Sequence, residues 1–226
     1  MSNMSGFKKH ARGHTGVFSS TIPVPEVRYM SGTVVYVESL IEEKWIGRYW
    51  SADSRINLLQ ESLPAEAFHL KLNDRILTTG WKWQYTTEAP PTERGARHIA
   101  VELSNTESAV DLKLHTLLDG IPVLTRWLEI TNHSCEHLPL NEISPWCGQL
   151  WLGENFAAGH FALDGWACEG WFEWMRLPKG ITEISSTKGQ GHDAPFFILR
   201  NEVTGQYFIG HLAWAANWMI HFVRKN

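Results

Sequence analysis

Residues 99–120, IAVELSNTESAVDLKLHTLLDG, contain two runs in which apolar and polar side chains alternate. The first run extends from Ile99 to Leu103, and the second extends from Val110 to Leu114. Because successive side chains of a β-strand point to opposite faces, this alternation is typical of strands with one buried face. The dipeptide Asp119-Gly120 then supplies a turn. The segment therefore predicts two strands that each cover one side of a core.

The same pattern recurs along most of the chain. Phe68–Leu72 alternates in the same way, and Asn73-Asp74 follows it as a turn. Further β-like runs are Val34–Val37, Val123–Ile130, Pro195–Leu199, Tyr207–Leu212 and Trp218–Val223, with turns at Asp164-Gly165 and Thr204-Gly205. Helical signal is limited to Ser39–Trp50, where one or two amphipathic turns are expected, and residues 86–96 are expected to form a loop. Short strands with closely spaced turns are typical of a sandwich or a barrel.

These patterns predict an all-β protein, built as one large antiparallel β-sandwich with little helix. The sandwich is expected over residues 23–226, after a flexible arm at residues 1–22 that is rich in Ser, Gly and His. A chain of 226 residues is long enough to bury a substantial core, and all-β sandwiches of about this size usually form one domain.

The composition excludes two classes of protein. Lys and Arg number 20 and Asp and Glu number 24, so the net charge is −4. A nucleic-acid-binding domain normally carries a basic excess, and a disordered chain carries few aromatic residues. Here aromatic residues make up 12% of the chain, and 12 Trp outnumber 10 Phe and 5 Tyr. So many indoles fit either an aromatic core, which is favoured for any single Trp, or flat surfaces on which sugar rings stack.

The sequence predicts a soluble, cytoplasmic protein with free thiols. Cys135, Cys147 and Cys168 are odd in number and widely spaced, so no disulfide framework is implied and buried free thiols are expected. The N-terminal segment MSNMSGFKKHARGHTG lacks the apolar run of a signal peptide. The longest uncharged apolar-rich stretch, Leu212–Val223, is shorter than the ~20 residues of a membrane-spanning helix, so no membrane partner is expected.

Aromatic and acidic residues gather between Trp146 and Trp174. The segment holds Trp146, Trp151, Trp166, Trp171 and Trp174 together with Glu154, Asp164, Glu169 and Glu173. Indole faces stack on the C–H face of a pyranose, and carboxylates accept hydrogen bonds from its hydroxyl groups. A carboxylate pair is also what glycoside hydrolysis requires. We favour a structural role for this segment over sugar contact, and sugar contact over catalysis.

The segment Asn132–His137 offers metal-ligating side chains without completing a site. On an extended strand His133, Cys135 and His137 would share one face, and zinc binds these residue types. No fourth ligand stands at a recognisable spacing, so we predict a solvated connection between strands and no metal. The sequence also lacks a phosphate-binding Gly-rich loop and a Gly-x-Ser-x-Gly nucleophile motif, so no cofactor is predicted.

Five segments carry motifs in a fixed order. They are Pro64–Phe68 with Leu70, Arg126–Asn132, Gly170-Trp171 with Glu173, Ser186–Gly189 with His192 and Pro195-Phe196, and Leu212–Trp218. The second resembles an Arg-x-x-x-Ile-x-Asn strand, and the fourth resembles a Ser-x-Arg-Gly…His…Pro-Phe run. In this order the five resemble the N-terminal β-supersandwich domain of melibiase-type α-galactosidases, glycoside hydrolase family thirty-six.

The resemblance implies a galactose-mutarotase-like supersandwich that packs on a catalytic (β/α)₈ barrel. In the family this barrel carries the two aspartates of a retaining α-galactosidase, which uses neither metal nor cofactor. A barrel needs about 250 residues, so a chain of 226 residues has no room for one, and the sandwich is expected to lack its last strands. We therefore expect no catalytic residue in this chain. The implied partners are galactosides or related sugars, the catalytic barrel and further copies of the chain.

Sugar contact is assigned to indoles close to predicted loops. The candidates are Trp81, Trp83, Trp146 and Trp151, on the basis of aromatic chemistry rather than of a matched family position. For each of them a place in the core is the alternative, and it is the favoured one.

Two other functions stay open. A stand-alone carbohydrate-binding sandwich would use exposed indoles in the same way. A mutarotase-like epimerase would need a positioned acid and base, for which His160 and Glu173 are candidates.

Overall fold

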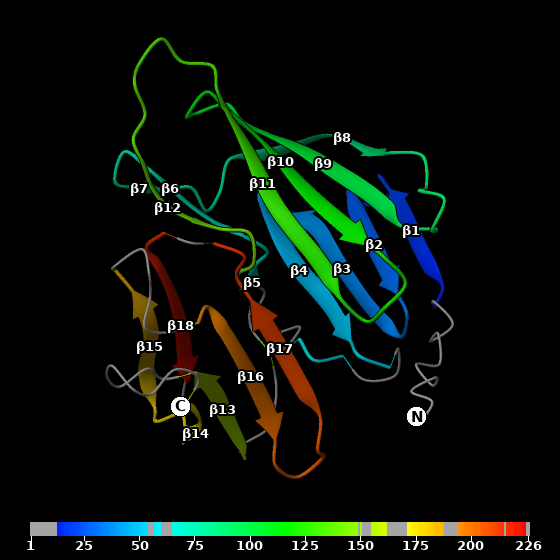
Figure 1. The fold of residues 1–226 in the computed structure, drawn as a ribbon. Helices are drawn as coiled ribbons and strands as arrows, with labels where there is room; N and C mark the ends of the chain where they lie inside the picture. The colour runs from blue at the N-terminus through cyan, green and yellow to red at the C-terminus, as the bar shows by residue number, and fades with distance from the viewer. Residues whose placement is uncertain are drawn as a thin grey trace, which may run out of the picture. The chain divides into compact units, whose positions relative to one another are not determined.

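The computed structural model describes residues 13–53, 57–59, 65–148, 150, 155–161, 171–187, 194–214 and 216–224. Within these ranges every regular element is a strand, from β1 to β18, and every strand pair is antiparallel (Figure 1). The prediction of an all-β antiparallel protein is therefore confirmed. Among the same residues, no helix is long and apolar enough to cross a lipid bilayer.

The chain divides into two compact units, residues 1–151 and 152–226. The sequence predicted a single sandwich over residues 23–226, so this boundary was not foreseen. Among the described residues, the first unit holds three sheets and the second holds two, and each unit is described by itself below.

The first sheet of the first unit has the order β1-β2-β3-β4-β5. Its strands are β1 (Thr15–Ser20), β2 (Glu26–Ser31), β3 (Val34–Ile41), β4 (Lys44–Ser51) and β5 (Ala65–Glu66). Strand β1 lies inside the range that we expected to be a flexible arm. It pairs with β2 over its whole length, and Val17 packs against the core. Because β1 contributes both ladder hydrogen bonds and buried apolar surface, these residues belong to the sheet.

The helical turns expected over Ser39–Trp50 do not form. Strands β3 and β4 make a hairpin instead, in which Ile41 pairs with Lys44. The two turn residues Glu42 and Glu43 have φ values of 47° and 58°, as a tight hairpin turn of the primed type requires. Trp45 is 1% exposed, so burial of this indole and the strand ladder outweigh the weak helical pattern.

The second sheet has the order β11-β10-β9-β8. Its strands are β8 (Trp81–Glu88), β9 (Arg97–Asn105), β10 (Val110–Leu118) and β11 (Leu124–Asn132). The segment quoted at the outset forms β9 and β10, whose register pairs Val101 with Leu114, so both predicted strands are confirmed. Along β10 buried and half-buried residues alternate without exception, which leaves one face of the sheet for the core and one for solvent.

A third, smaller sheet has the order β12-β6-β7, formed by β12 (Leu140–Ser144), β6 (His69–Leu72) and β7 (Arg75–Ile76). One hydrophobic core joins residues from all three sheets, among them Tyr29, Trp45, Leu70, Trp81 and Leu114. Burial of each such large apolar side chain contributes about 1.5–3 kcal/mol. The core therefore fixes which side of the β8–β11 sheet is turned to solvent.

The second unit contains a four-stranded and a two-stranded sheet. The first has the order β14-β13-β16-β17 and the second pairs β15 with β18. The strands are β13 (Phe156–Phe161), β14 (Phe172–Arg176), β15 (Gly180–Ser186), β16 (Phe196–Asn201), β17 (Tyr207–His211) and β18 (Trp218–Arg224). Buried apolar residues of this unit include Ala158, Ile184, Leu199, Trp218 and Phe222.

Candidate functional site

Trp81 lies in the core and not on a sugar-facing surface. It is 1% exposed, and its indole N–H donates a hydrogen bond to the carbonyl oxygen of Leu77 at 3.2 Å. Its ring meets the ring of Phe68 edge to face, with centroids 5.3 Å apart. Both faces of the indole are therefore occupied by protein, and the core alternative holds for Trp81.

Trp146 takes part in a buried network of rings and charges. Its ring packs against Tyr36 and Trp50, with centroids 5.3 and 5.1 Å away, and the Arg126 guanidinium lies 4.2 Å from its centroid. Arg126 donates to both carboxylate oxygens of Glu38, one of them at 2.8 Å, and both side chains are fully buried. The Tyr36 hydroxyl donates to the same carboxylate at 3.0 Å. The polar groups of Arg126, Glu38 and Tyr36 are thus hydrogen-bonded to one another.

The electrostatics of this network follow from burial. Burial alone would lower the pKa of Arg126, but the adjacent Glu38 carboxylate outweighs it and raises that pKa. Burial and, after it, the negative charge of Glu38 raise the pKa of the Tyr36 hydroxyl. Arg126 therefore stays charged and Tyr36 stays neutral at physiological pH. A buried ion pair whose charges are met by protein groups fits a structural role better than ligand binding.

Trp83 is the candidate that lies at an open hollow. The hollow has a volume of about 420 Å³ and is lined by Ser19, Ser20, Thr21, Ile22, Trp83, Tyr85 and Thr86, from the edge strands β1 and β8 and the residues after β1. The half-buried indole of Trp83 donates to the Thr86 hydroxyl at 3.1 Å. Aromatic rings and hydroxyl groups suit a sugar, so sugar contact at Trp83 stays a prediction. The fourth candidate, Trp151, lies outside the described residues.

The aromatic and acidic segment is described only in part. Trp151, Glu154, Asp164, Trp166 and Glu169 lie outside the described residues. Trp171 and Trp174 are exposed by 63% and 40%, and the Arg200 guanidinium lies 4.2 Å from the ring centroid of Trp174. The second unit therefore has two exposed indoles, as the hypothesis of sugar contact requires.

His160 and Glu173 are brought together as a cross-strand pair of β13 and β14. The His160 Nε2 atom lies 3.3 Å from the Glu173 carboxylate, while His160 Nδ1 is buried without a hydrogen-bond partner. His160 is 7% exposed, and Glu173 reaches solvent. The geometry needed for an acid and base pair is therefore present, but the imidazole is largely closed to a substrate.

The His133 side chain is engaged by a carboxylate on a neighbouring strand, with Nε2 2.6 Å from Asp111. Within the described ranges, no three His, Cys, Asp or Glu side chains gather closely enough to hold a metal ion. Cys135 and Cys147 are free and exposed, so the expectation of buried thiols is wrong for these two, while Cys168 lies outside the described residues. Both cysteines follow strands that end at the surface, which explains their exposure.

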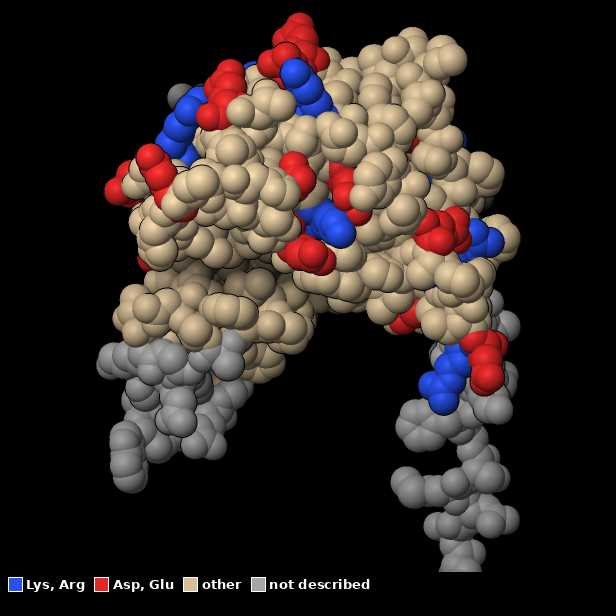
Figure 2. Space-filling view, turned by 90° about the horizontal axis from the view of Figure 1, so that it is seen from above, with Lys and Arg blue, Asp and Glu red and all other residues tan. Residues whose placement is uncertain are grey.

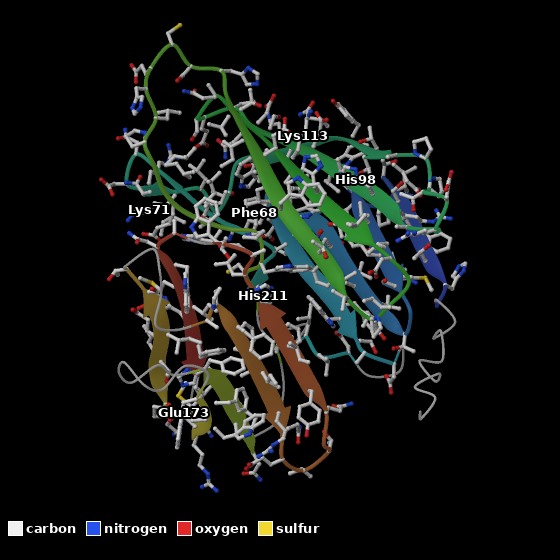
Figure 3. The ribbon with its side chains drawn as sticks, viewed as in Figure 1. Phe68, Lys71, His98, Lys113, Glu173 and His211 are labelled. Atoms are coloured by element: carbon white, nitrogen blue, oxygen red, sulfur yellow. The ribbon has the colours of Figure 1, made fainter. Side chains whose placement is uncertain are left out.

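The solvent face of the β8–β11 sheet carries a ring cluster that the sequence reasoning missed. His98, His115 and Trp127, from β9, β10 and β11, have ring centroids 4.9–5.1 Å apart. Figure 3 shows His98 and Lys113 on this sheet. From above, acidic and basic side chains are interspersed and form no single basic patch on the visible face (Figure 2). The missed signal was the position of Trp127, which follows the buried Arg126 and so faces outward.

Comparison with known protein families and proteins shows which family this chain is similar to. The sequence model of the family described as "Glycosyl hydrolase family 36 N-terminal domain" matches residues 67–226 of this chain. A search of curated proteins gave no match.

Several solved structures share the fold. The GH36 α-galactosidase AgaB from Geobacillus stearothermophilus is similar with a TM-score of 0.69 and 14% identity, over 93% of this chain and 36% of that one. The α-galactosidase from Lactobacillus brevis gives 0.67 and 16%, over 88% and 34%. The galactosidase domain of the α-galactosidase–sucrose kinase AgaSK gives 0.64 and 11%, over 91% and 40%. The present chain thus spans little more than a third of the length of these structures.

Proposed function

Since this chain belongs to the family of glycosyl hydrolase family 36 N-terminal domains, we propose that it serves as the non-catalytic N-terminal domain of an α-galactosidase-like glycoside hydrolase. The observation that carries the proposal is the family match over residues 67–226, joined to a fold shared with about a third of each α-galactosidase structure. The proposed arrangement of the sheets is the galactose-mutarotase-like supersandwich.

The hollow at Trp83 is suited to sugar contact without catalysis. Retaining glycosidases need two carboxyl groups about 5–5.5 Å apart beside the glycosidic bond. The residues that line the hollow at Trp83 supply hydroxyl groups and aromatic rings, and none of these lining residues is an Asp or a Glu. Such a lining can hold a sugar but has no acid or nucleophile with which to cleave it.

In this proposal the reaction takes place on a catalytic barrel outside the 226 residues. The parent enzyme would release terminal α-galactosides with retention, using one aspartate as nucleophile and another as acid and base. This domain would pack on the barrel, help to wall its sugar pocket and contribute to contacts between copies. Of the four indoles that we predicted to contact sugar, Trp83 is the one we propose for this wall, because it lines a hollow. A cytoplasmic location stays a prediction from the sequence.

Reading the coding sequence downstream of codon 226 tests the proposal. We expect an in-frame barrel that carries two catalytic aspartates. A stop codon at this position would contradict the role as a domain of a larger enzyme, and it would favour a stand-alone carbohydrate-binding module. Calorimetric titration with galactose, melibiose and raffinose then tests that module, which should bind with a sub-millimolar Kd, about −4 kcal/mol or stronger.

The distance of 3.3 Å between His160 and Glu173 gives a second candidate function, a mutarotase-like epimerase. Mutarotation needs one group to donate a proton to the ring oxygen while another removes the proton of the anomeric hydroxyl. Polarimetry of freshly dissolved α-galactose, with and without the protein, tests this candidate. An accelerated approach to equilibrium that a His160→Gln variant loses would establish it, and an unchanged rate would dismiss it.

A further inference from the structure

The indole of Trp127 lies flat across two imidazole rings. His98 Nε2 and His115 Nδ1 are 3.0 Å apart, so the two imidazoles meet edge to edge through a hydrogen bond. The Trp127 ring is tilted by 19° and 5° from them, with its centroid 5.1 and 4.9 Å from theirs. Because His98 is two strands away from Trp127, the indole must lean over β10 to reach it. One face of the indole therefore covers both imidazoles.

The other face of this indole is turned to solvent. The His115 side chain is only 11% exposed beneath the indole, whereas Trp127 itself is 42% exposed. The Glu129 carboxylate holds His115 Nε2 at 3.2 Å, which fixes the tautomer of that imidazole and with it the hydrogen bond to His98. A flat aromatic surface held in place by packing loses little conformational entropy when a ligand stacks on it.

A row of hydrogen-bonding groups lies next to this ring on the same sheet. The next row across the sheet pairs Tyr85, Glu102, Lys113 and Glu129 in register. The Lys113 ammonium lies 3.3 Å from Glu102 and 3.9 Å from Glu129, so the row holds its charges in place. A shallow hollow of about 270 Å³ adjoins the row and is lined by Thr87, Glu88, Ala89, His98, Ala100, Glu102, Lys113 and His115.

We propose that the exposed face of Trp127 is a saccharide-binding platform on which a neutral pyranose stacks, with the Glu129 and Glu102 carboxylates and the Lys113 ammonium available to its hydroxyl groups. A protein partner fits this face less well, because interface cores are apolar and poor in charge, whereas two exposed aromatic rings here, Trp127 and Tyr85, stand among ionic side chains. The choice of a galactoside rests on the proposed function, since the axial 4-hydroxyl of galactose leaves one ring face lined by C–H groups.

Ligand-observed saturation-transfer NMR and calorimetry with raffinose and melibiose test the platform on the whole chain. We expect saturation transfer to the ring protons of the galactose residue. Trp127→Ala should weaken binding by about tenfold or more, and Trp127→Phe should weaken it less because a smaller flat ring remains. His115→Ala removes the support under the indole and should weaken binding while Trp127 is still present.

Matched variants separate this site from others. Trp171→Ala removes an indole of the second unit that is even more exposed, 63% against 42% for Trp127, and should leave binding unchanged. If Trp83→Ala abolishes binding while Trp127→Ala leaves it intact, the saccharide sits in the hollow between β1 and β8 and the proposal is wrong. Absence of any transfer or heat with the wild-type chain would overturn it as well. Either failure would leave the domain assignment standing, because that assignment depends on the downstream barrel and not on binding at Trp127.

Discussion

The guanidinium of Arg126 on β11 and the carboxylate of Glu38 on β3 form a two-point ion pair inside the first unit, and neither side chain is exposed to solvent. These strands belong to different sheets, so the pair joins the two sheets through the core. The Thr116 hydroxyl accepts from Arg126 at 3.3 Å, and the rings of Tyr36 and Trp146 lie against the guanidinium.

Removal of one partner of this pair should be strongly destabilising. Arg126→Ala or Glu38→Ala leaves a buried, unpaired charge, and we expect each to lower the free energy of unfolding by about 3–5 kcal/mol. Urea unfolding followed by fluorescence measures the loss. In the Arg126→Met/Glu38→Leu double variant the unpaired charge is gone, so much of the loss should be recovered.

The exposed pair of Arg75 and Glu107 provides the control. Its atoms approach to 2.8 Å, but the two side chains are 61% and 57% exposed. Arg75→Ala should therefore change the free energy of unfolding by no more than about 1 kcal/mol. Equal losses in the buried and exposed pairs would show that burial of the Arg126–Glu38 pair is irrelevant to stability.

Trp81 should behave as a core residue. Because its ring is enclosed, Trp81→Ala leaves a cavity and should cost about 3–5 kcal/mol of unfolding free energy. Trp171→Ala removes a ring that is 63% exposed and should cost about 0.5 kcal/mol or less. Thermal unfolding of the two variants beside the wild type makes the comparison. A stable Trp81→Ala protein that loses only sugar binding would reverse the assignment of Trp81 to the core.

A substitution in the hairpin turn between β3 and β4 should increase the stability of the protein. Glu43 holds a φ of 58°, a left-handed conformation that costs a side-chain-bearing residue roughly 1–2 kcal/mol. Glu43→Gly relieves that cost, and we expect a gain of about 0.5–1 kcal/mol in unfolding free energy after the added chain entropy. Gly205→Ala is the converse control, since Gly205 has a φ of 69° and open space around it, and it should lose stability. A loss with Glu43→Gly would contradict the assigned turn.

The stability of the protein should fall on acidification in part through His98. Burial and, after it, the charge of His115 lower the pKa of His98 in the folded state. As the pH falls below the ordinary value of about 6.5, the unfolded chain therefore takes up its proton first, and the free energy of unfolding decreases. Above that pH the imidazole is neutral in both states and contributes no slope. Urea midpoints across this range should fall less steeply in His98→Gln, and parallel curves would argue against the lowered pKa.

The strands were predictable from the sequence wherever one face of the sheet is buried and the other is exposed to solvent. Strand β10 illustrates this from Val110 to Leu114, where the apolar residues face the core and the polar residues between them do not. Further along the strand the pattern is reversed, because Thr116 is buried and Leu117 lies on the other face. The β3–β4 hairpin was missed because its turn is Glu42-Glu43 and not the Asn-Gly or Asp-Gly that usually mark such turns. Strand β1 was missed because its short sequence is rich in Ser and Gly, and its pairing with β2 decides its state.

The orientation of individual indoles could not be predicted, because it depends on how sheets pack on each other. Trp81 and Trp83 share one side of β8, and only the packing of the sheets shows that this side meets the core. A bulge between Trp83 and Tyr85 then turns Tyr85 outward, opposite Glu102. The stacking of Trp127 on His98 needs the register of three strands, which no local pattern encodes.

The central claim is that these 226 residues form a non-catalytic domain of an α-galactosidase-like enzyme. Its most direct test is the turnover of a chromogenic α-galactoside by the purified chain, after circular dichroism has established that the strands are folded. We predict a rate equal to that of the buffer alone. Turnover that co-purifies with the folded chain through gel filtration would place a catalytic centre within these residues and contradict the account.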